Sequence, residues 1–189
     1  MRTHPLRLLF VCTANISRSP YAERRARMLL GHEPVLVASA GVPGLPARTM
    51  DPQMADQLRQ RGGDPEGHLS RCLNDVILAD VDAVLTFELA QQYRVFESWP
   101  EAESRTFGLG QFAEAVGRLE STDLPAGELV ARLRNVASPN SMGWDVDDPY
   151  KRGKRAARAA ARQIDGLVET IVTRLTTGSG GPRRLANGR

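Results

Sequence analysis

A group of residues suited to nucleophilic chemistry lies near the N-terminus, between Cys12 and Pro20. A cysteine thiolate is a strong nucleophile, and the planar guanidinium of Arg18, six residues further on, can bind two oxygens of one phosphoryl group. The residues between them are mostly small or polar, as a loop that wraps around an anion requires. This combination predicts phosphoryl transfer with Cys12 as the nucleophile and Arg18 as the phosphate ligand.

The elements on either side of this loop explain how it would work. Residues 6–12 form a continuous apolar run of the length typical of a strand buried on both faces. Ser19 and Pro20 have the pattern of a helix N-cap followed by proline at the first helical position. Backbone N–H groups of a loop that closes onto a helix N-terminus converge on one point and favour an anion there. The same field favours the thiolate form of Cys12, and the Ser19 hydroxyl is placed to hydrogen-bond its sulfur.

Strand and helix signals alternate along the rest of the chain. Strands are predicted at residues 6–12, 35–38, 83–86 and 105–109. Helices are predicted at residues 21–30, 51–61, 73–79, 88–96, 112–119, 128–135 and 152–176. This order predicts an α/β three-layer sandwich, with a four-stranded parallel sheet and helices on both faces. Ligands in such folds bind at the carboxyl ends of the strands, and the first strand ends at Cys12.

Length and charge predict one soluble domain at residues 1–176, followed by a disordered basic tail at residues 177–189. The net charge of +3 equals the charge of the three arginines in that tail, so the body is neutral and no nucleic-acid partner is expected. The basic run at residues 151–162 is interpreted as a solvated helix face. No apolar run is long enough to span a bilayer, which predicts a cytoplasmic protein without a membrane partner.

The chain contains two cysteines and three histidines, and neither set has the spacing of metal ligands. We therefore expect no metal and no cofactor, so the chemistry would depend on side chains alone. A disulfide between Cys12 and Cys72 is not expected in a reducing compartment. The sequence leaves the oligomeric state open between a monomer and a weak homodimer.

Residues 11–20 resemble the active-site loop of the low-molecular-weight protein tyrosine phosphatases. Three further segments agree with that family in the same order. Ser39-Ala40-Gly41 follows the second expected strand, His68-Leu69-Ser70-Arg71 is similar to a His-x-x-Arg segment, and Asp148-Pro149-Tyr150 is similar to the loop that carries the general acid. The resemblance covers roughly residues 6–176.

The resemblance implies a phosphomonoester hydrolase, with a protein tyrosine phosphatase as the main expectation, that acts through a phosphocysteine intermediate. Cys12, Arg18 and Asp148 would be catalytic, with Asp148 as general acid and then base. Asp145 and Asp147 lie close by in the sequence, and only Asp148 precedes the Pro-Tyr pair. The expected phosphate-binding loop comprises Thr13, Ala14, Asn15, Ile16, Ser17 and Arg18.

The family pattern also assigns supporting residues. Ser39 and His68 would join Ser19 around the active-site loop and hold Asn15 in an unusual backbone shape. Leu45 and Tyr150 would form walls of the pocket. Relatives that prefer phosphotyrosine often carry an aromatic residue in the segment 42–50, whereas this chain has none there. The expected substrate is a phosphorylated protein, chiefly one carrying phosphotyrosine, or a small phosphomonoester.

Two positions depart from the family pattern, and three other functions remain open. Ala14 stands where the family usually has glycine, which would cost about 1 kcal/mol or more if the backbone there needed a positive φ. Ser17 stands where many members carry a second cysteine. The alternatives are an arsenate reductase using an external thiol, a non-catalytic phosphate-binding module, and a protein-arginine phosphatase. Ile16 argues against the last, because those relatives have threonine there.

Overall fold

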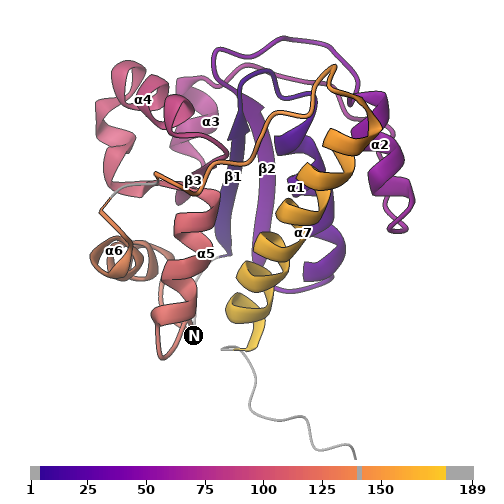
Figure 1. Cartoon of the computed structure of the whole chain (residues 1–189). Helices are drawn as coiled ribbons and strands as arrows, with labels where there is room; N and C mark the ends of the chain where they lie inside the picture. The colour runs from indigo at the N-terminus through magenta and orange to yellow at the C-terminus, as the bar shows by residue number, and fades with distance from the viewer. Residues whose placement is uncertain (1–4, 140–141, 178–189) are drawn as a thin grey trace, which may run out of the picture.

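The computed structural model describes residues 5–139 and 142–177, which form one parallel sheet surrounded by helices (Figure 1). The strands are β1 (Leu6–Cys12), β2 (Val35–Gly41), β3 (Ala83–Thr86) and β4 (Thr106–Gly108). The helices are α1 (Arg18–Leu30), α2 (Pro52–Arg59), α3 (Asp75–Ala79), α4 (Leu89–Ser98), the 3-10 helix η1 (Pro100–Arg105), α5 (Leu109–Arg118), α6 (Ala126–Val136) and α7 (Gly153–Thr177).

The sheet has the strand order β2-β1-β3-β4, and all three neighbouring pairs are parallel. Its central strand β1 pairs along its whole length with β2, from Leu6 opposite Val35 to Cys12 opposite Gly41. On its other side β1 pairs with β3, where Val11 lies opposite Thr86. A central parallel strand is buried on both faces, which explains the continuous apolar run of β1. The predicted four-stranded parallel sheet is confirmed.

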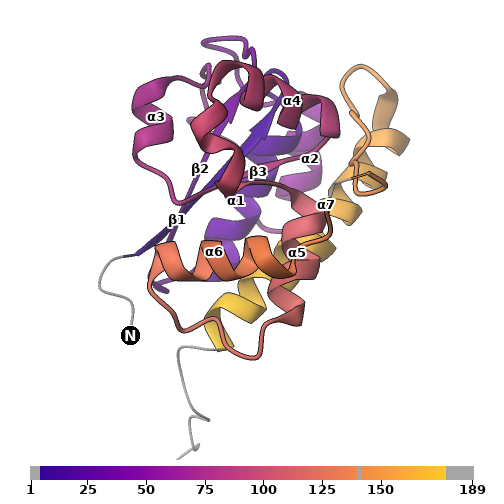
Figure 2. The same cartoon turned by 90° about the vertical axis from the view of Figure 1, so that its left-hand side faces the viewer.

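Alternate residues of β1 supply the two sides of the core. Leu8 and Phe10 pack into the larger hydrophobic cluster, with residues of α1, α2, α5, α6 and α7. Leu9 and Val11 pack into a second cluster, with residues of α3, α4 and η1. Figure 2 shows the sheet between α3 and α4 on one side and α1 and α7 on the other. Helices therefore cover both faces, as the alternation of strand and helix signals predicted.

The carboxyl ends of the strands bring the chemically interesting segments together. Cys12 ends β1, Gly41 ends β2 and Thr86 ends β3, and these residues lie near the same edge of the sheet. The turn from β1 to α1 crosses this edge, and the segment before α7 passes over it (Figure 1). Residues far apart in the sequence thus meet around Cys12.

Several boundaries differ from the sequence-based expectation. Helix α1 begins at Arg18, and its N-cap is Ser17 with no side-chain hydrogen bond, so the capping role predicted for Ser19 is wrong. The Asp51-Pro52 pair has the same cap-plus-proline pattern in the sequence, and there the pattern is confirmed, because Asp51 accepts a hydrogen bond from the backbone N–H of Met54 and Pro52 opens α2. Strand β2 continues to Gly41 and therefore includes the Ser-Ala-Gly segment that was expected to follow it.

The predicted basic tail, apart from Thr177 at the end of α7, lies outside the described residues. Within residues 5–139 and 142–177, none of the helices combines the length and the apolar character that a bilayer-crossing segment needs.

Candidate active site

The loop from Cys12 to Ser17 is held from outside through its carbonyl groups. The carbonyls of Cys12, Thr13 and Ala14 accept backbone hydrogen bonds from Val42, Gly44 and Leu45, at 2.9, 2.9 and 3.3 Å. The remaining three carbonyls accept from His68 Nε2 at 2.8 Å, from the Asp51 N–H at 2.7 Å and from the Tyr21 N–H at 3.4 Å. Each carbonyl of the loop is therefore bound by a donor that lies outside the loop.

The N–H groups of the same loop behave differently. Among the described residues, the N–H groups from Thr13 to Ser17 donate to no hydrogen-bond acceptor. Two buried side-chain donors nearby, Ser17 Oγ and Arg18 Nε, also have no partner in the described part of the chain. Unpaired buried donors are costly unless a ligand or water satisfies them. A loop with its carbonyls bound outside and its donors unpaired is suited to bind an anion such as phosphate.

Cys12 lies at the end of β1, next to this loop, and is only 3% exposed. Its Sγ lies 3.0 Å from Ser19 Oγ, so one turn of α1 brings a hydroxyl to the sulfur, as the sequence suggested. Cys72 is also a free thiol, and it bridges to Gly41, the residue paired with Cys12. Two steps across a sheet separate Cα atoms by about 10 Å, which is too far for a disulfide without movement of the backbone.

Asn15 is the centre of a buried hydrogen-bond network on the inner side of the loop. Its Nδ2 donates to Ser19 Oγ and Ser39 Oγ, both at 2.9 Å, and its Oδ1 accepts from the Arg71 N–H at 2.9 Å. The Asn15 backbone has φ 59, a left-handed conformation that asparagine tolerates better than most residues. The network ties that conformation to β2 and to the segment that carries His68 and Arg71.

His68 contributes to this network from outside the loop. Its Nε2 donates to the Asn15 carbonyl at 2.8 Å, and burial lowers its pKa below the ordinary value for histidine. The hydrogen bond to Asn15 and the negative charge of Glu23 act in the opposite direction, but burial is the largest effect. The Glu23 carboxylate also accepts a hydrogen bond from Ser39 Oγ at 2.6 Å, which extends the network to α1.

Gly41 allows β2 to approach the loop closely. A Cβ atom on Gly41 would lie 2.8 Å from Gly44 Cα, 2.9 Å from the Ala14 carbonyl carbon and 3.0 Å from the Asn15 backbone nitrogen. All three of these neighbours are backbone atoms and cannot swing aside. A side chain at this position would therefore push the loop away from the sheet.

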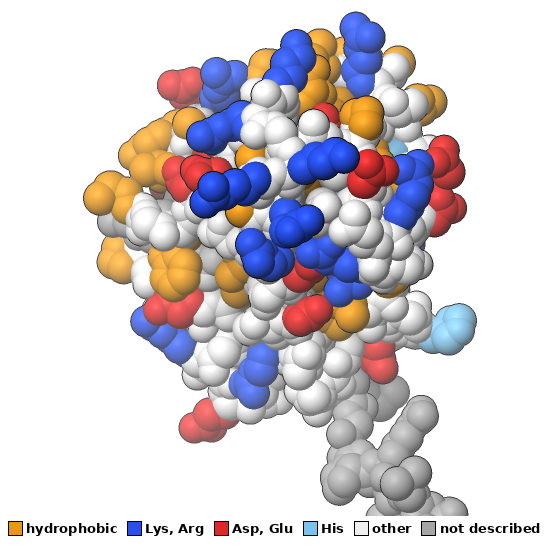
Figure 3. All heavy atoms as spheres, turned by 45° about the vertical axis from the view of Figure 1, so that its right-hand side comes forward, with side chains coloured by type: hydrophobic (Ala, Val, Ile, Leu, Met, Phe, Trp, Pro, Cys, Tyr) orange, Lys and Arg blue, Asp and Glu red, His pale blue; other side chains and the backbone are white. Residues whose placement is uncertain are grey.

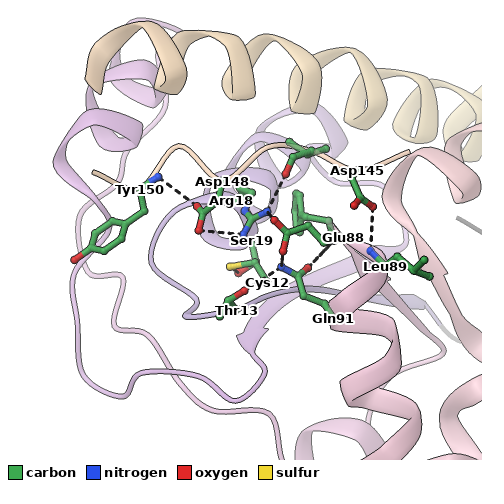
Figure 4. Close-up of polar contacts among 12 residues, drawn as sticks. Cys12, Thr13, Arg18, Ser19, Glu88, Leu89, Gln91, Asp145, Asp148 and Tyr150 are labelled. Carbon is green, nitrogen blue, oxygen red and sulfur yellow. Dashed lines mark hydrogen bonds and ion pairs between the residues drawn. The ribbon is translucent and has the colours of Figure 1, made fainter. Parts of the chain in front are cut away.

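Arg18 is buried, with its side chain 1% exposed, and it contacts two acidic residues. Its Nη1 donates to Glu88 Oε1 at 2.6 Å and to the Val146 carbonyl at 2.8 Å. Its Nη2 lies 3.3 Å from Asp148 Oδ2. Figure 4 shows the Arg18 guanidinium close to Cys12, with Glu88 and Asp148 beside it. Nη1 is thus held by Glu88 and Val146 and Nη2 is paired with Asp148, while Nε has no partner in the described part of the chain.

The structure distinguishes among the three neighbouring aspartates. Asp148 is the one that lies beside Arg18, and its side chain is 44% exposed. Asp145 instead accepts a hydrogen bond from the Leu89 N–H at 3.0 Å, at the start of α4. Asp147 is exposed and forms no ion pair with a described residue. Asp148 is therefore the carboxylate best placed to exchange a proton with a group bound near Cys12.

The residues expected to form the pocket wall border a hollow beside the loop. Leu45 and Tyr150 line a space of about 320 Å³ together with the loop residue Ile16 and the exposed Arg48. Leu45 and Tyr150 are both partly exposed, at 47% and 41%. The Tyr150 ring points away from Cys12 in Figure 4, so the wall that it offers lies at the rim of the site.

The two departures from the family pattern have plain structural outcomes. Ala14 is not among the described residues with a positive φ, so the strain considered for alanine at this position does not arise. Ser17 lies buried at the N-cap of α1, where its unpaired hydroxyl is one of the donors near Cys12.

Sequence reasoning missed Glu88 and Gln91. Glu88 follows β3 and reaches Arg18, 70 residues away in the sequence. Gln91 Nε2 donates to Glu88 Oε2 at 3.0 Å and to Thr13 Oγ1 at 3.2 Å, so it joins Glu88 to the loop. The only signal that pointed to Glu88 was its place at the carboxyl end of a strand, where ligands of such sheets bind.

Across residues 5–139 and 142–177, no group of three or more His, Cys, Asp or Glu side chains is arranged to hold a metal ion. The expectation of a site without a metal or cofactor remains a prediction.

In this parallel α/β fold, the loop after the first strand joins a cysteine to an arginine, and its N–H groups have no partner among the described residues. These features together define a class of phosphate-handling enzyme. A family model described as "Low molecular weight phosphotyrosine protein phosphatase" matches residues 7–127. The chain therefore belongs to the low-molecular-weight protein tyrosine phosphatase family. That match ends before Asp148, so the role of Asp148 depends on its geometry and on the Asp-Pro-Tyr pattern.

Individual relatives agree with this assignment. The low-molecular-weight protein-tyrosine-phosphatase Etp of Escherichia coli strain K12 is 37% identical over 107 residues, which cover 57% of this chain and 71% of that protein. The YwlE arginine phosphatase from Geobacillus stearothermophilus has a TM-score of 0.73 at 25% identity, over 92% of this chain and 94% of that chain. Vibrio vulnificus Wzb in complex with benzylphosphonate has a TM-score of 0.69 at 25% identity, over 90% and 99% of the two chains.

Proposed function

We propose that the chain is a metal-independent protein tyrosine phosphatase that forms a phosphocysteine on Cys12. The observation that carries this proposal is the loop of residues 12–17, whose carbonyls are bound outside while its N–H groups, Ser17 Oγ and Arg18 Nε have no described partner. These donors surround the end of β1, where Cys12 Sγ lies. A dianionic phosphoryl group would satisfy several of them at once.

The first step transfers the phosphoryl group to sulfur. The Cys12 thiolate attacks phosphorus, an S–P bond forms, and the P–O bond to the leaving group breaks in line with it. Asp148 gives its proton to the departing oxygen, which would otherwise leave as an unstable anion. Arg18 and the loop N–H groups hold the charge that spreads over the equatorial oxygens in the transition state.

The second step regenerates the enzyme. Asp148, now a carboxylate, removes a proton from water, and the resulting nucleophile attacks phosphorus. The S–P bond breaks, inorganic phosphate is released and Cys12 returns to the thiolate. The Ser19 hydroxyl, 3.0 Å from Sγ, can donate to the sulfur as it regains its negative charge and so makes it a better leaving group.

Hydrolysis of p-nitrophenyl phosphate in the presence of EDTA tests this proposal directly. We expect turnover that survives EDTA and disappears in Cys12→Ser, while Cys12→Ser still binds inorganic phosphate. Cys72→Ser is the matched control, and its turnover should equal that of the unaltered chain, because Cys72 lies across β2 from the loop. Absence of turnover in the reduced, unaltered chain would reject the proposal and favour a non-catalytic phosphate-binding module.

A phosphoarginine-specific enzyme is a second candidate, because the YwlE arginine phosphatase has a closely similar fold. Ile16 argues against it on the family pattern, and its buried side chain lines the hollow beside the loop. Matched peptides carrying phosphotyrosine or phosphoarginine separate the two functions. We expect a higher kcat/KM for phosphotyrosine, and the opposite order would reassign the substrate. Arsenate with an added small thiol tests the reductase alternative, for which we expect no turnover above background.

A further inference from the structure

The first half of helix α7 and the turn before it carry an unusual concentration of positive charge. Half of the residues from 151 to 162 are lysine or arginine, and none is acidic. All six basic side chains are exposed: Lys151, Arg152, Lys154, Arg155, Arg158 and Arg162, here called the basic row. Figure 3 shows lysine and arginine side chains gathered on the face of the molecule that lies toward α2 and α7 in Figure 1.

The members of the basic row have no acidic partners among the described residues. None of them forms an ion pair with any residue in the described part of the chain. Arginines on and next to the neighbouring helices are different. Arg25 of α1 and Arg61, two residues after α2, both pair with Asp165, and Arg59 of α2 pairs with Glu66. Asp165 and Glu66 are thus already paired with these arginines. The positive charge of the basic row remains free to attract an outside anion.

The basic row begins at the edge of the candidate active site. Tyr150 borders the hollow beside the loop, and the Lys151 ammonium lies 5.2 Å from the centroid of the Tyr150 ring. Helix α7 starts two residues later at Gly153, and the positive end of its dipole adds to the charge of the row. The row therefore continues the rim of the site along the surface of the molecule.

We propose that the basic row binds an acidic segment of the phosphoprotein substrate while its phosphorylated residue lies over Cys12. This inference rests on the proposed phosphatase function and specifies the substrate class. The stretch of α7 from Gly153 to Arg162 is about 14 Å long, at 1.5 Å per residue, and four residues of extended peptide span about the same distance. The acidic residues would thus lie about two to six positions from the phosphorylated one.

A protein segment fits this surface better than a membrane does. Amphipathic helices that lie on membranes insert an apolar face, but the apolar residues of α7, among them Ile164, Val168 and Leu175, are buried in the core. The row also adjoins a site that the proposed function assigns to single phosphorylated side chains. Carboxylates close to such a residue would reach both surfaces at once, and the second contact would then be intramolecular.

Competing peptides measure this preference. Two phosphotyrosine peptides differ only at four positions, which are glutamate in one peptide and glutamine in the other. The pair is made twice, once with these positions before the phosphotyrosine and once with them after it. We expect kcat/KM for the acidic peptide to exceed that for the neutral one by about tenfold at low ionic strength, since exposed ion pairs are individually weak. At about 0.5 M salt the ratio should approach one, because screening is then strong.

Two triple variants assign the preference to α7. In the variant with Arg155→Gln, Arg158→Gln and Arg162→Gln the acidic-to-neutral ratio should fall to about threefold or less, because only part of the row remains. The control carries Arg94→Gln, Arg118→Gln and Arg132→Gln, which remove the same charge from exposed arginines on other helices. Its ratio should stay near tenfold. Each ratio compares two peptides on one enzyme, so a general change in activity cancels.

A binding assay separates this proposal from the phosphatase proposal. Fluorescence anisotropy with Cys12→Ser and the same labelled peptides measures affinity without turnover, so it is informative even if the chain hydrolyses nothing. Equal affinity for acidic and neutral peptides, or an equal loss in both triple variants, would overturn the proposal. Binding of anionic phospholipid vesicles or of single-stranded RNA that depends on the row, without discrimination between the peptides, would overturn it in favour of those partners.

Discussion

The inner and outer sides of the active-site loop are built in opposite ways. On the inner side, Asn15, Ser39 and His68 are buried and joined by hydrogen bonds of 2.8 to 2.9 Å. On the outer side, Asp148 is 44% exposed, Tyr150 is 41% exposed, and their direct contact is a hydrogen bond of 3.3 Å. Under the proposed function, the inner side, which would hold the phosphoryl group, is tied by buried hydrogen bonds, whereas the outer side, which would exchange protons and admit substrate, has few restraints.

This comparison predicts two kinds of variant. Changes on the outer side should alter turnover with little effect on stability, because few contacts are lost. Changes on the inner side should lower the free energy of unfolding and turnover together, since the same hydrogen bonds support both the fold and the loop. Turnover and the free energy of unfolding are therefore measured together for each variant.

Asp148→Asn should have the largest effect. We expect kcat for phosphotyrosine peptides to fall by about 10² to 10³-fold, because amide cannot give a proton to the leaving oxygen. The free energy of unfolding should stay within about 0.5 kcal/mol of the unaltered value, since the side chain is half exposed. The loss should be smaller for p-nitrophenyl phosphate, whose leaving group needs less help. An equal loss for both substrates would show that Asp148 acts on binding or structure instead.

Asn15→Ala tests the inner side. Alanine in the left-handed conformation costs about 1 to 2 kcal/mol, and three lost hydrogen bonds of about 1 kcal/mol each add to it, so we expect destabilisation of at least about 3 kcal/mol. Urea unfolding measures this change, and kcat/KM should fall with it. Asn15→Gly is the matched control, because glycine removes the backbone strain and leaves only the loss of hydrogen bonds. Identical stability of the two variants would reject the strain that we assign to φ 59.

The same comparison explains how much the sequence could predict. The run from Cys12 to Ser19 is local, so strand, loop and helix signals with the chemistry of each residue were enough to propose it. Asp51 was correctly predicted as a cap, whereas Ser19 was not, because its hydroxyl is used by Cys12 and Asn15. Propensity cannot rank a cap against such tertiary partners.

Contacts that close across the sheet were harder to predict. Glu88 meets Arg18 only because β3 pairs with β1 in a particular register, and its own neighbourhood in the sequence gives no sign of a charged partner. The resemblance supplied Ser39, His68 and Asp148, which spacing alone would not have selected. The unpaired state of the basic row could not be read from the sequence. Asp165 lies only three residues after Arg162, but in the structure it pairs with Arg25 of α1 and with Arg61, just after α2.

Tyr150→Ala should have a moderate effect confined to substrate binding. Because Tyr150 borders the rim and points away from Cys12, we expect KM for phosphotyrosine peptides to rise by about threefold with kcat nearly unchanged, as loss of uniform binding predicts. Leu45→Ala, at another residue that lines the hollow, is the companion variant and should behave alike. A large fall in kcat in either variant would place the rim among the residues that support the transition state and weaken the contrast between the two sides.

The pH dependence of stability is the smallest expected effect and tests His68. Burial lowers its pKa in the folded chain below the value of about 6.5 for an exposed histidine, so between those two values the unfolded chain binds the proton more readily. The free energy of unfolding should therefore decrease as pH falls below about 6.5, and this contribution should be fully present above it.

His68→Gln isolates this contribution, because glutamine can still donate to the Asn15 carbonyl but does not titrate. Unfolding by urea between pH 5 and 7 should show a shallower slope in the variant than in the unaltered chain. His32→Gln, a change at an exposed histidine just beyond the C-terminal end of α1, should leave the slope as it was. A steeper loss of stability toward higher pH in the unaltered chain would mean that His68 is held in its charged form. Glu23 would then outweigh burial, and the inner side of the loop would depend on an ion pair instead of neutral hydrogen bonds.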